Sequence, residues 1–157
     1  MRTKTQFSTG IVAPERHAAE LDLVVPFTTP ELTRVALDAA SRMGAGLNAT
    51  VRLIRVQVVP YPLPPEQSPV YIEFLKEQMA ELRSDLPVAR EIRLARSVAD
   101  GLLGTLGRES VVILAAPKRP WTTRYERLAA ALRRAGHMVV LVTPGAFVET
   151  KQEPVHA

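Results

Sequence analysis

Residues 21–60 read LDLVVPFTTPELTRVALDAASRMGAGLNATVRLIRVQVVP, and this stretch sets the pattern of the chain. Residues 21–27 form a nearly continuous apolar run, which is typical of a strand buried on both faces. Thr29 followed by Pro30 is a typical helix start, and apolar residues then recur three and four positions apart as far as Gly44. In residues 47–59 apolar and polar side chains alternate, which predicts a second strand.

The alternation of strand and helix continues to residue 143. The pattern predicts a helix over residues 68–86, a strand over 88–96, a short helix that begins at a capping box of Ser97 and Asp100, a strand over 111–116, a helix that begins at a capping box of Thr123 and Glu126, and a strand over 137–143. Strands that alternate with helices favour an α/β fold, in which a parallel sheet is covered by helices on both faces. Pro26 lacks a backbone donor, so we expect it at the end of its strand, where pairing stops.

Composition limits the kinds of protein that this chain can be. Its 157 residues, 46% of them hydrophobic, fit one domain over residues 21–145, with an N-terminal arm at 1–20 and a tail at 146–157. The absence of cysteine excludes disulfides and a cysteine nucleophile. We find no signal-peptide pattern and no apolar run long enough to span a bilayer, so we expect a cytoplasmic protein without membrane insertion. The net charge of +4 is compatible with anionic ligands.

The stretch 21–60 resembles the opening of a universal stress protein domain. Such a domain begins with a buried strand, a Val-Pro-Val-Asp-Gly-Ser-type turn, an alanine-rich helix that ends in glycine, and a strand that ends in Val-Val-Pro. The segments VVILAAP (111–117) and HMVVLVTP (137–144) resemble its last two strands. This resemblance implies a Rossmann-like, three-layer open sheet of five strands in the order 3-2-1-4-5. It also implies ATP or AMP as ligands at the carboxyl ends of the strands, and often a homodimer through the last strand.

The sequence departs from the nucleotide-binding members of that family in two places. Thr28 stands where their first strand ends in an aspartate that contacts adenine. After the fourth strand they carry glycines whose N–H groups surround phosphate, whereas this chain reads AAPKRPWTTRYERL (115–128) and has no glycine between Gly107 and Gly136. Pro117 and Pro120 remove two further donors from the same loop. The usual phosphate cradle therefore cannot form here.

Side chains could replace the glycine cradle at the same edge of the sheet. An anion would be held between the first loop and the loop after the fourth strand, by Thr28, Thr29, Lys118, Arg119, Thr122, Thr123 and Arg124. The competing interpretation is a solvated basic turn in which Trp121 covers the sheet edge. Phe27, Val58 and Val59 are candidates for adenine contact, and plain core packing is the alternative for them.

Catalysis, metal binding and nucleic-acid binding have little support in the sequence. His17, His137 and His156 are scattered, and none has a partner at metal-ligand spacing. No nucleophile lies in a Gly-x-Ser-x-Gly turn. The arginines around Arg133 fall on an amphipathic helix, and aromatic residues are too few for a stacking platform.

The last strand predicts self-association. Its segment MVVLV is apolar and β-branched, and in the order that the resemblance implies it lies at the sheet edge. Such an edge needs covering, and antiparallel pairing with a second copy would cover it, through Met138, Val139, Val140, Leu141 and Val142. The alternative is that the arm or the tail covers this edge instead.

These observations favour a non-enzymatic regulatory or interaction domain of the universal stress type that lacks the usual ATP loop. We expect a homodimer, with an unidentified protein as a further partner. One alternative is a divergent domain that binds ATP, AMP or another anion. A second is a soluble accessory domain that regulates a membrane transporter.

Overall fold

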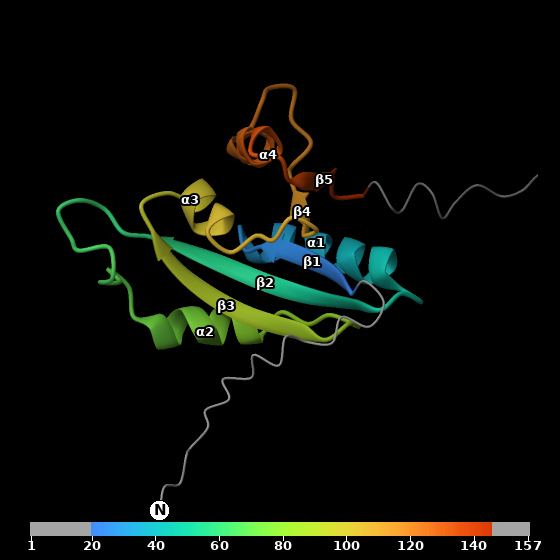
Figure 1. The fold of residues 1–157 in the computed structure, drawn as a ribbon, viewed down its shortest axis with the longest axis horizontal. Helices are drawn as coiled ribbons and strands as arrows, with labels where there is room; N and C mark the ends of the chain where they lie inside the picture. Colours follow the sequence, from blue (N-terminus) through green and yellow to red (C-terminus); the bar gives the residue numbers. More distant parts are fainter. Residues whose placement is uncertain (1–19, 146–157) are drawn as a thin grey trace, which may run out of the picture.

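The computed structural model describes residues 20–145, and Figure 1 shows their arrangement. Nine elements follow one another along this part of the chain: β1 (Leu21–Pro26), α1 (Pro30–Gly44), β2 (Ala49–Val58), α2 (Ile72–Ala80), β3 (Val88–Ala95), α3 (Val98–Leu103), β4 (Val111–Ala115), α4 (Arg124–Arg134) and β5 (Met138–Val142). Of the predicted arm, only Glu20 is described. The predicted tail, His17 and His156 lie outside the described residues.

The five strands form one parallel sheet in the order β3-β2-β1-β4-β5, which confirms the predicted fold class and strand order. The order reverses beside β1, so the loops after β1 and β4 leave the sheet on opposite sides and open a space at the carboxyl ends of the strands. Pro26 is the last residue of β1, as expected, and pairing continues for one more bond, from Phe27 N–H to the Ile54 carbonyl at 2.8 Å.

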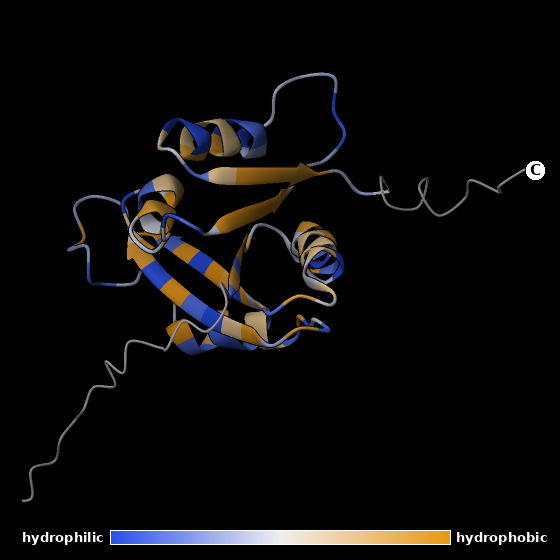
Figure 2. Cartoon of the chain, turned by 45° about the vertical axis from the view of Figure 1, so that its right-hand side comes forward, coloured by the Kyte–Doolittle hydropathy of each residue, from blue (hydrophilic) through white to orange (hydrophobic). Residues whose placement is uncertain are grey.

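Helices cover both faces of the sheet, so the molecule has three layers. On one face α1 and α2 pack with Leu23, Val51 and Leu53, and on the other α3 and α4 pack with Val24 and Ile54. Figure 2 shows β4 and β5 almost uniformly hydrophobic, whereas β2 and β3 are striped with hydrophilic residues. No helix within residues 20–145 is long and apolar enough to cross a membrane.

The prediction for the second helix was wrong at both ends. α2 begins at Ile72, because the Ser68 hydroxyl bonds the backbone of Val70 in a local turn that is not helical. It ends at Ala80, and Arg90 of β3 donates to the carbonyls of Met79 and Leu82 just beyond that end. Leu82 is buried, as its apolar spacing indicated, but it lies in the turn after the helix.

The predicted caps form in full at α1 and α4, and in part at α3. The Thr29 hydroxyl accepts from Leu32 N–H at 3.2 Å and caps α1. The capping box at the start of α4 is complete, because Thr123 and Glu126 bond each other's backbone. At α3 the structure forms only half of the predicted box, with the Ser97 hydroxyl accepting from Asp100 N–H.

Candidate functional site

The carboxyl ends of β1 and β2 border a cavity of about 530 Å³, which we call the carboxyl-end crevice. Residues from β2, α3, α4 and the turn after β1 converge on it, so four segments that are distant in sequence build one hollow. The lining residues are Phe27, Thr28, Arg55, Val56, Gln57, Val98, Ala99, Arg124, Tyr125, Arg127, Leu128 and Ala131. The crevice lies beside the point where the strand order reverses, which is where open α/β sheets bind their ligands.

The charge of the carboxyl-end crevice is entirely positive. Arg55, Arg124 and Arg127 line it, and no Asp or Glu is among its lining residues. Guanidinium groups form paired hydrogen bonds to carboxylates and phosphates, so Arg124 and Arg127 of α4 favour an anionic ligand, whereas the Arg55 guanidinium is bonded to Gln78 of α2. The other lining residues are mainly apolar or aromatic, so the cavity also has surface for the non-polar part of a ligand.

Arg55 is fixed in place before any ligand arrives. It lies over the ring of Phe27, 4.3 Å from the ring centre, and its guanidinium donates to Gln78 Oε1 at 2.6 Å. Burial lowers the pKa of the Arg55 guanidinium below its usual value, because the charged form loses water.

Arg124 and Arg127 approach the crevice from the first turn of α4. The Arg124 guanidinium stacks on Tyr125, 4.9 Å from the ring centre, and donates to the Tyr125 hydroxyl at 2.8 Å. The capping box uses the N–H groups of Thr123 and Glu126, so these two amides are already bonded within the helix start. Side chains, more than main-chain amides, are therefore the donors that this helix start offers to an anion.

The structure separates the predicted anion cluster into two groups. Thr28 and Arg124 line the carboxyl-end crevice, whereas Lys118, Arg119 and Thr122 are exposed outside its lining. Thr29 and Thr123 act as helix caps.

The adenine candidates are separated in the same way. Phe27 lines the crevice, but Val58 and Val59 do not. Val59 is only 1% exposed and therefore belongs to the core, whereas Val58 is 38% exposed.

Sequence reasoning missed Arg55, Gln57, Tyr125 and Arg127 as lining residues. A signal was present for Arg55, because it continues the alternate positions of β2 that begin with the buried Ala49, Val51 and Leu53. A cation on the apolar side of a strand needs a local partner, and Gln78 of α2 and the Phe27 ring supply it.

The crevice lining holds few of the groups that usually act as general bases. Its residues include no Asp, Glu, His, Cys or Lys. Within residues 20–145, no group of three or more His, Cys, Asp or Glu residues could hold a metal ion.

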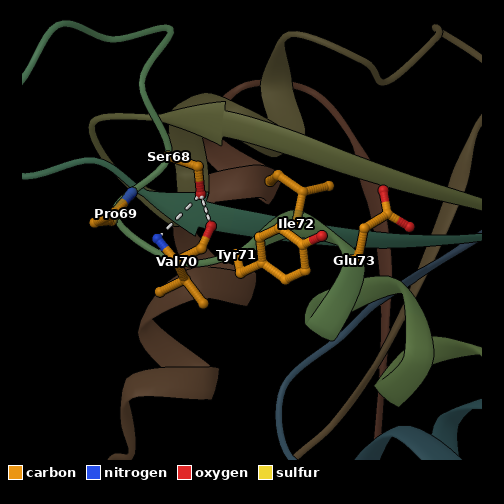
Figure 3. A pocket seen from close by; sticks show the side chains of 6 residues that line it. All are labelled: Ser68, Pro69, Val70, Tyr71, Ile72 and Glu73. Atoms are coloured by element: carbon orange, nitrogen blue, oxygen red, sulfur yellow. Dashed lines mark hydrogen bonds between the residues drawn. The ribbon is translucent and has the colours of Figure 1, made fainter.

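A second hollow, also of about 530 Å³, lies at the start of α2 and differs in kind. All six of its lining residues belong to the single segment Ser68 to Glu73, and Figure 3 shows their side chains along one continuous stretch of chain. The Ser68 hydroxyl is occupied by the backbone of Val70. Polar groups from separate elements do not converge there, so we do not treat this hollow as a site.

A polar network at the amino end of the sheet fixes the opposite end of the molecule. Arg52 of β2 binds both carboxylate oxygens of Asp22, at 2.8 and 2.9 Å, and Ser110 donates to the same carboxylate at 2.6 Å. Burial alone would raise the pKa of Asp22, but the donors Arg52 and Ser110 and the charge of Arg52 outweigh it, so this pKa lies below its usual value. Arg52 also donates to Thr105, which ties the end of α3 to β2. We interpret this network as structural.

No protein-family model matches the sequence, and a search of curated proteins finds no match.

Proposed function

We propose that this chain is a non-enzymatic regulatory domain that responds to an organic anion bound in the carboxyl-end crevice. The observation that carries this proposal is the crevice lining, where Arg124 and Arg127 lie beside Tyr125 and no acidic residue is present. We further propose that the domain is of the universal stress type, with side chains in place of the glycine-rich phosphate loop. The strand order β3-β2-β1-β4-β5 is the one that this resemblance implies.

The proposed ligand has a charged end and a flat or apolar body. Arg124 and Arg127 would bind the charged end, because both are exposed at the mouth of the crevice. Phe27 and Val56 would contact the body of the ligand. AMP and ATP are the nucleotides to test first, and inorganic phosphate tests the charged end alone.

Calorimetric titration of the full chain with AMP, ATP and inorganic phosphate tests this proposal. We expect binding of at least one nucleotide, and we expect the double variant Arg124→Gln/Arg127→Gln to weaken it by about 10-fold or more, because charged hydrogen bonds contribute roughly 1.5–3 kcal/mol each. The matched control is Arg83→Gln/Arg108→Gln, which removes the same charge from exposed sites in the α2–β3 and α3–β4 loops, at the amino ends of the strands.

Two results would contradict the proposal. The first is no measurable heat with any of the three anions. The second is equal weakening by both double variants, which would show attraction to overall positive charge and not to the crevice. If the purified chain hydrolyses ATP and the variant Arg124→Gln/Arg127→Gln does not, the proposal that the domain is non-enzymatic is refuted, but the proposal that the crevice binds an anion is not.

We also propose that the domain forms a homodimer through β5. The two edges of the sheet differ, because β3 presents Arg90, Glu91 and Arg93 whereas β5 carries no charged side chain. Charges on an edge strand discourage pairing, and an apolar edge invites it. Met138 is 65% exposed at the start of β5, which leaves apolar surface for a partner to cover.

A further inference from the structure

The loop that joins β4 to α4, residues 116–123, takes no part in lining the carboxyl-end crevice. Figure 1 shows this loop, in orange, rising beyond α4 and away from the sheet. Lys118, Arg119, Pro120 and Trp121 are all exposed on it, and 61% of the Trp121 surface is open. Most of the Trp121 surface is left in water, so packing within the fold does not explain an indole at this position.

The charges of this β4–α4 loop are unbalanced. No Asp or Glu occurs in residues 117–125, and no acidic side chain among residues 20–145 pairs with Lys118 or Arg119. The next acid, Glu126, is held in the capping box with Thr123. The Arg119 guanidinium lies 5.6 Å from the centre of the Trp121 ring, so cation and indole face solvent together.

We propose that the β4–α4 loop docks this domain on the surface of an anionic lipid bilayer. Trp121 enters the headgroup layer, where indole rings are favoured, and Lys118 and Arg119 bind lipid phosphates. Pro117 and Pro120 limit the conformations of the loop, which lowers the entropy lost on docking. This docking is peripheral and is separate from ligand binding in the carboxyl-end crevice.

The shape of the loop favours a bilayer over a nucleic acid. A nucleic-acid strand is bound in a groove with several aromatic stacking partners, whereas this loop projects outward and carries one aromatic residue. A projecting tip of one indole flanked by cations suits a flat anionic surface.

Trp121 is the only tryptophan in the chain, so its fluorescence reports this loop alone. The experiment titrates the full chain with phosphatidylcholine vesicles, with and without phosphatidylglycerol, and follows the emission of Trp121. We expect a blue shift with the anionic vesicles only. Raising the salt from about 0.1 M to about 1 M should reverse the shift, because the screening length falls from about 10 Å to about 3 Å.

Variants separate a specific loop from general positive charge. Lys118→Gln/Arg119→Gln should weaken binding to anionic vesicles by about 30-fold, given that each cation near such a surface is worth about fivefold. The control Arg83→Gln/Arg108→Gln makes the same change in net charge in two loops at the other end of the sheet and should bind as the wild type does. Trp121→Ala, measured by vesicle co-sedimentation, should also lose binding, and its circular dichroism should be unchanged because the side chain is exposed.

Three outcomes would overturn this inference: no blue shift of the wild type with anionic vesicles, equal weakening by both double variants, or a shift with RNA or polyglutamate but not with vesicles. The proposal for the carboxyl-end crevice is tested independently, because the variant Lys118→Gln/Arg119→Gln should leave nucleotide binding unchanged. If the chain binds vesicles but shows no heat of nucleotide binding, only the proposal for the crevice is refuted. If it binds nucleotide but not vesicles, only the proposal for the docking loop is refuted.

Discussion

Asp22 joins three segments that are distant in sequence, because Arg52 of β2 and Ser110 before β4 both donate to its carboxylate. The Asp22 side chain is 30% exposed and the Arg52 side chain is 21% exposed, so water screens this ion pair only in part. When one member of such a pair is removed, the other loses its partner but stays partly desolvated. The stability of the amino end of the sheet should therefore depend on this carboxylate.

We expect Asp22→Asn to lower the free energy of unfolding by about 2 kcal/mol at pH 7. The pKa of Asp22 is lowered by folding, so its stabilising effect is complete above the unfolded pKa, about 3.9, and is lost as the pH falls through the folded value. The difference between wild type and variant should thus be constant above about pH 5 and shrink below about pH 4. Urea unfolding at a series of pH values measures both.

Asp38→Asn is the matched control for Asp22→Asn. Asp38 also pairs with an arginine, Arg42 at 3.0 Å, but both side chains are about half exposed on the surface of α1. An exposed pair of this kind contributes less than about 0.5 kcal/mol. Equal losses in the two variants would show that the Asp22 network is no stronger than a surface ion pair.

Single residues mark the limit of prediction from sequence for this site. Phe27 and Thr28 could be placed at the end of a strand from periodicity, and Arg124 at the start of a helix from the capping box. Arg127 could not, because its position on α4 gives no sign that α3 and α4 meet over the same end of β2. The separation of Lys118 and Arg119 from Arg124 also depends on the path of a loop, which periodicity does not describe.

Among the elements, α3 packs unusually close to the sheet because of one glycine. A Cβ atom on Gly101 would lie 2.5 and 2.7 Å from the two methyl groups of Val56 and 3.2 Å from Ala95. Valine is stiff about its first side-chain bond, so these methyl groups cannot easily move aside. Val56 also lines the carboxyl-end crevice, so the position of α3 and the shape of the crevice depend on the same contact.

We expect Gly101→Ala to destabilise the protein by about 1–2 kcal/mol, although alanine is the better helix former by about 1 kcal/mol. Thermal and urea unfolding measure the loss. In a Val56→Ala background the same substitution should cost less, because the space that the new methyl group needs is then free. A gain in stability from Gly101→Ala alone would show that α3 can move away from β2 without cost.

Gly104→Ala provides the control within the same segment. Gly104 has ordinary helical backbone angles, and its nearest contact, at 3.4 Å, is a carbonyl of its own helix. We expect a change within about 0.5 kcal/mol.

Element boundaries were harder to predict than element types. The apolar spacing of Leu75, Met79 and Leu82 correctly indicated buried residues, but it could not show that Arg90 would bond the carbonyls where α2 ends. Ser68 and Pro69 had the composition of a helix start, yet the Ser68 hydroxyl stabilises a turn instead. Local sequence signals give the kind of element, and contacts from distant strands determine where it stops.

For the whole molecule, the alternation of elements predicted a parallel sheet covered by helices, the resemblance implied the strand order, and every strand was placed within two residues. The reason is that buried parallel strands need long apolar runs, and these are visible in sequence. The assembly of the molecule is a different question, because it depends on which edge of the sheet remains unpaired. At β5 the backbone N–H and C=O groups point alternately toward β4 and toward the open edge, so single substitutions can test whether this edge pairs with a second copy.

The backbone groups of β5 point alternately to β4 and to the open edge. The Val142 carbonyl accepts from Ala116 N–H at 2.9 Å, so Val142 and Val140 face β4, and Leu141 and Val139 face outward. Arg133 donates to the outward Val139 carbonyl at 2.9 Å and so covers part of the edge. An incoming strand would displace this bond and gain pairing at Leu141.

We therefore expect the wild type to have twice the monomer mass of 17.3 kDa in light scattering, and Leu141→Pro to be monomeric. Proline at Leu141 removes an outward N–H and leaves the bonds to β4 in place, so the variant should stay folded. Val140→Pro removes a donor that faces β4, and it should lower the melting temperature much more than Leu141→Pro does. Arg133→Ala frees the Val139 carbonyl and should strengthen dimerisation. A monomeric wild type, or a Leu141→Pro variant that remains dimeric, would exclude pairing through β5.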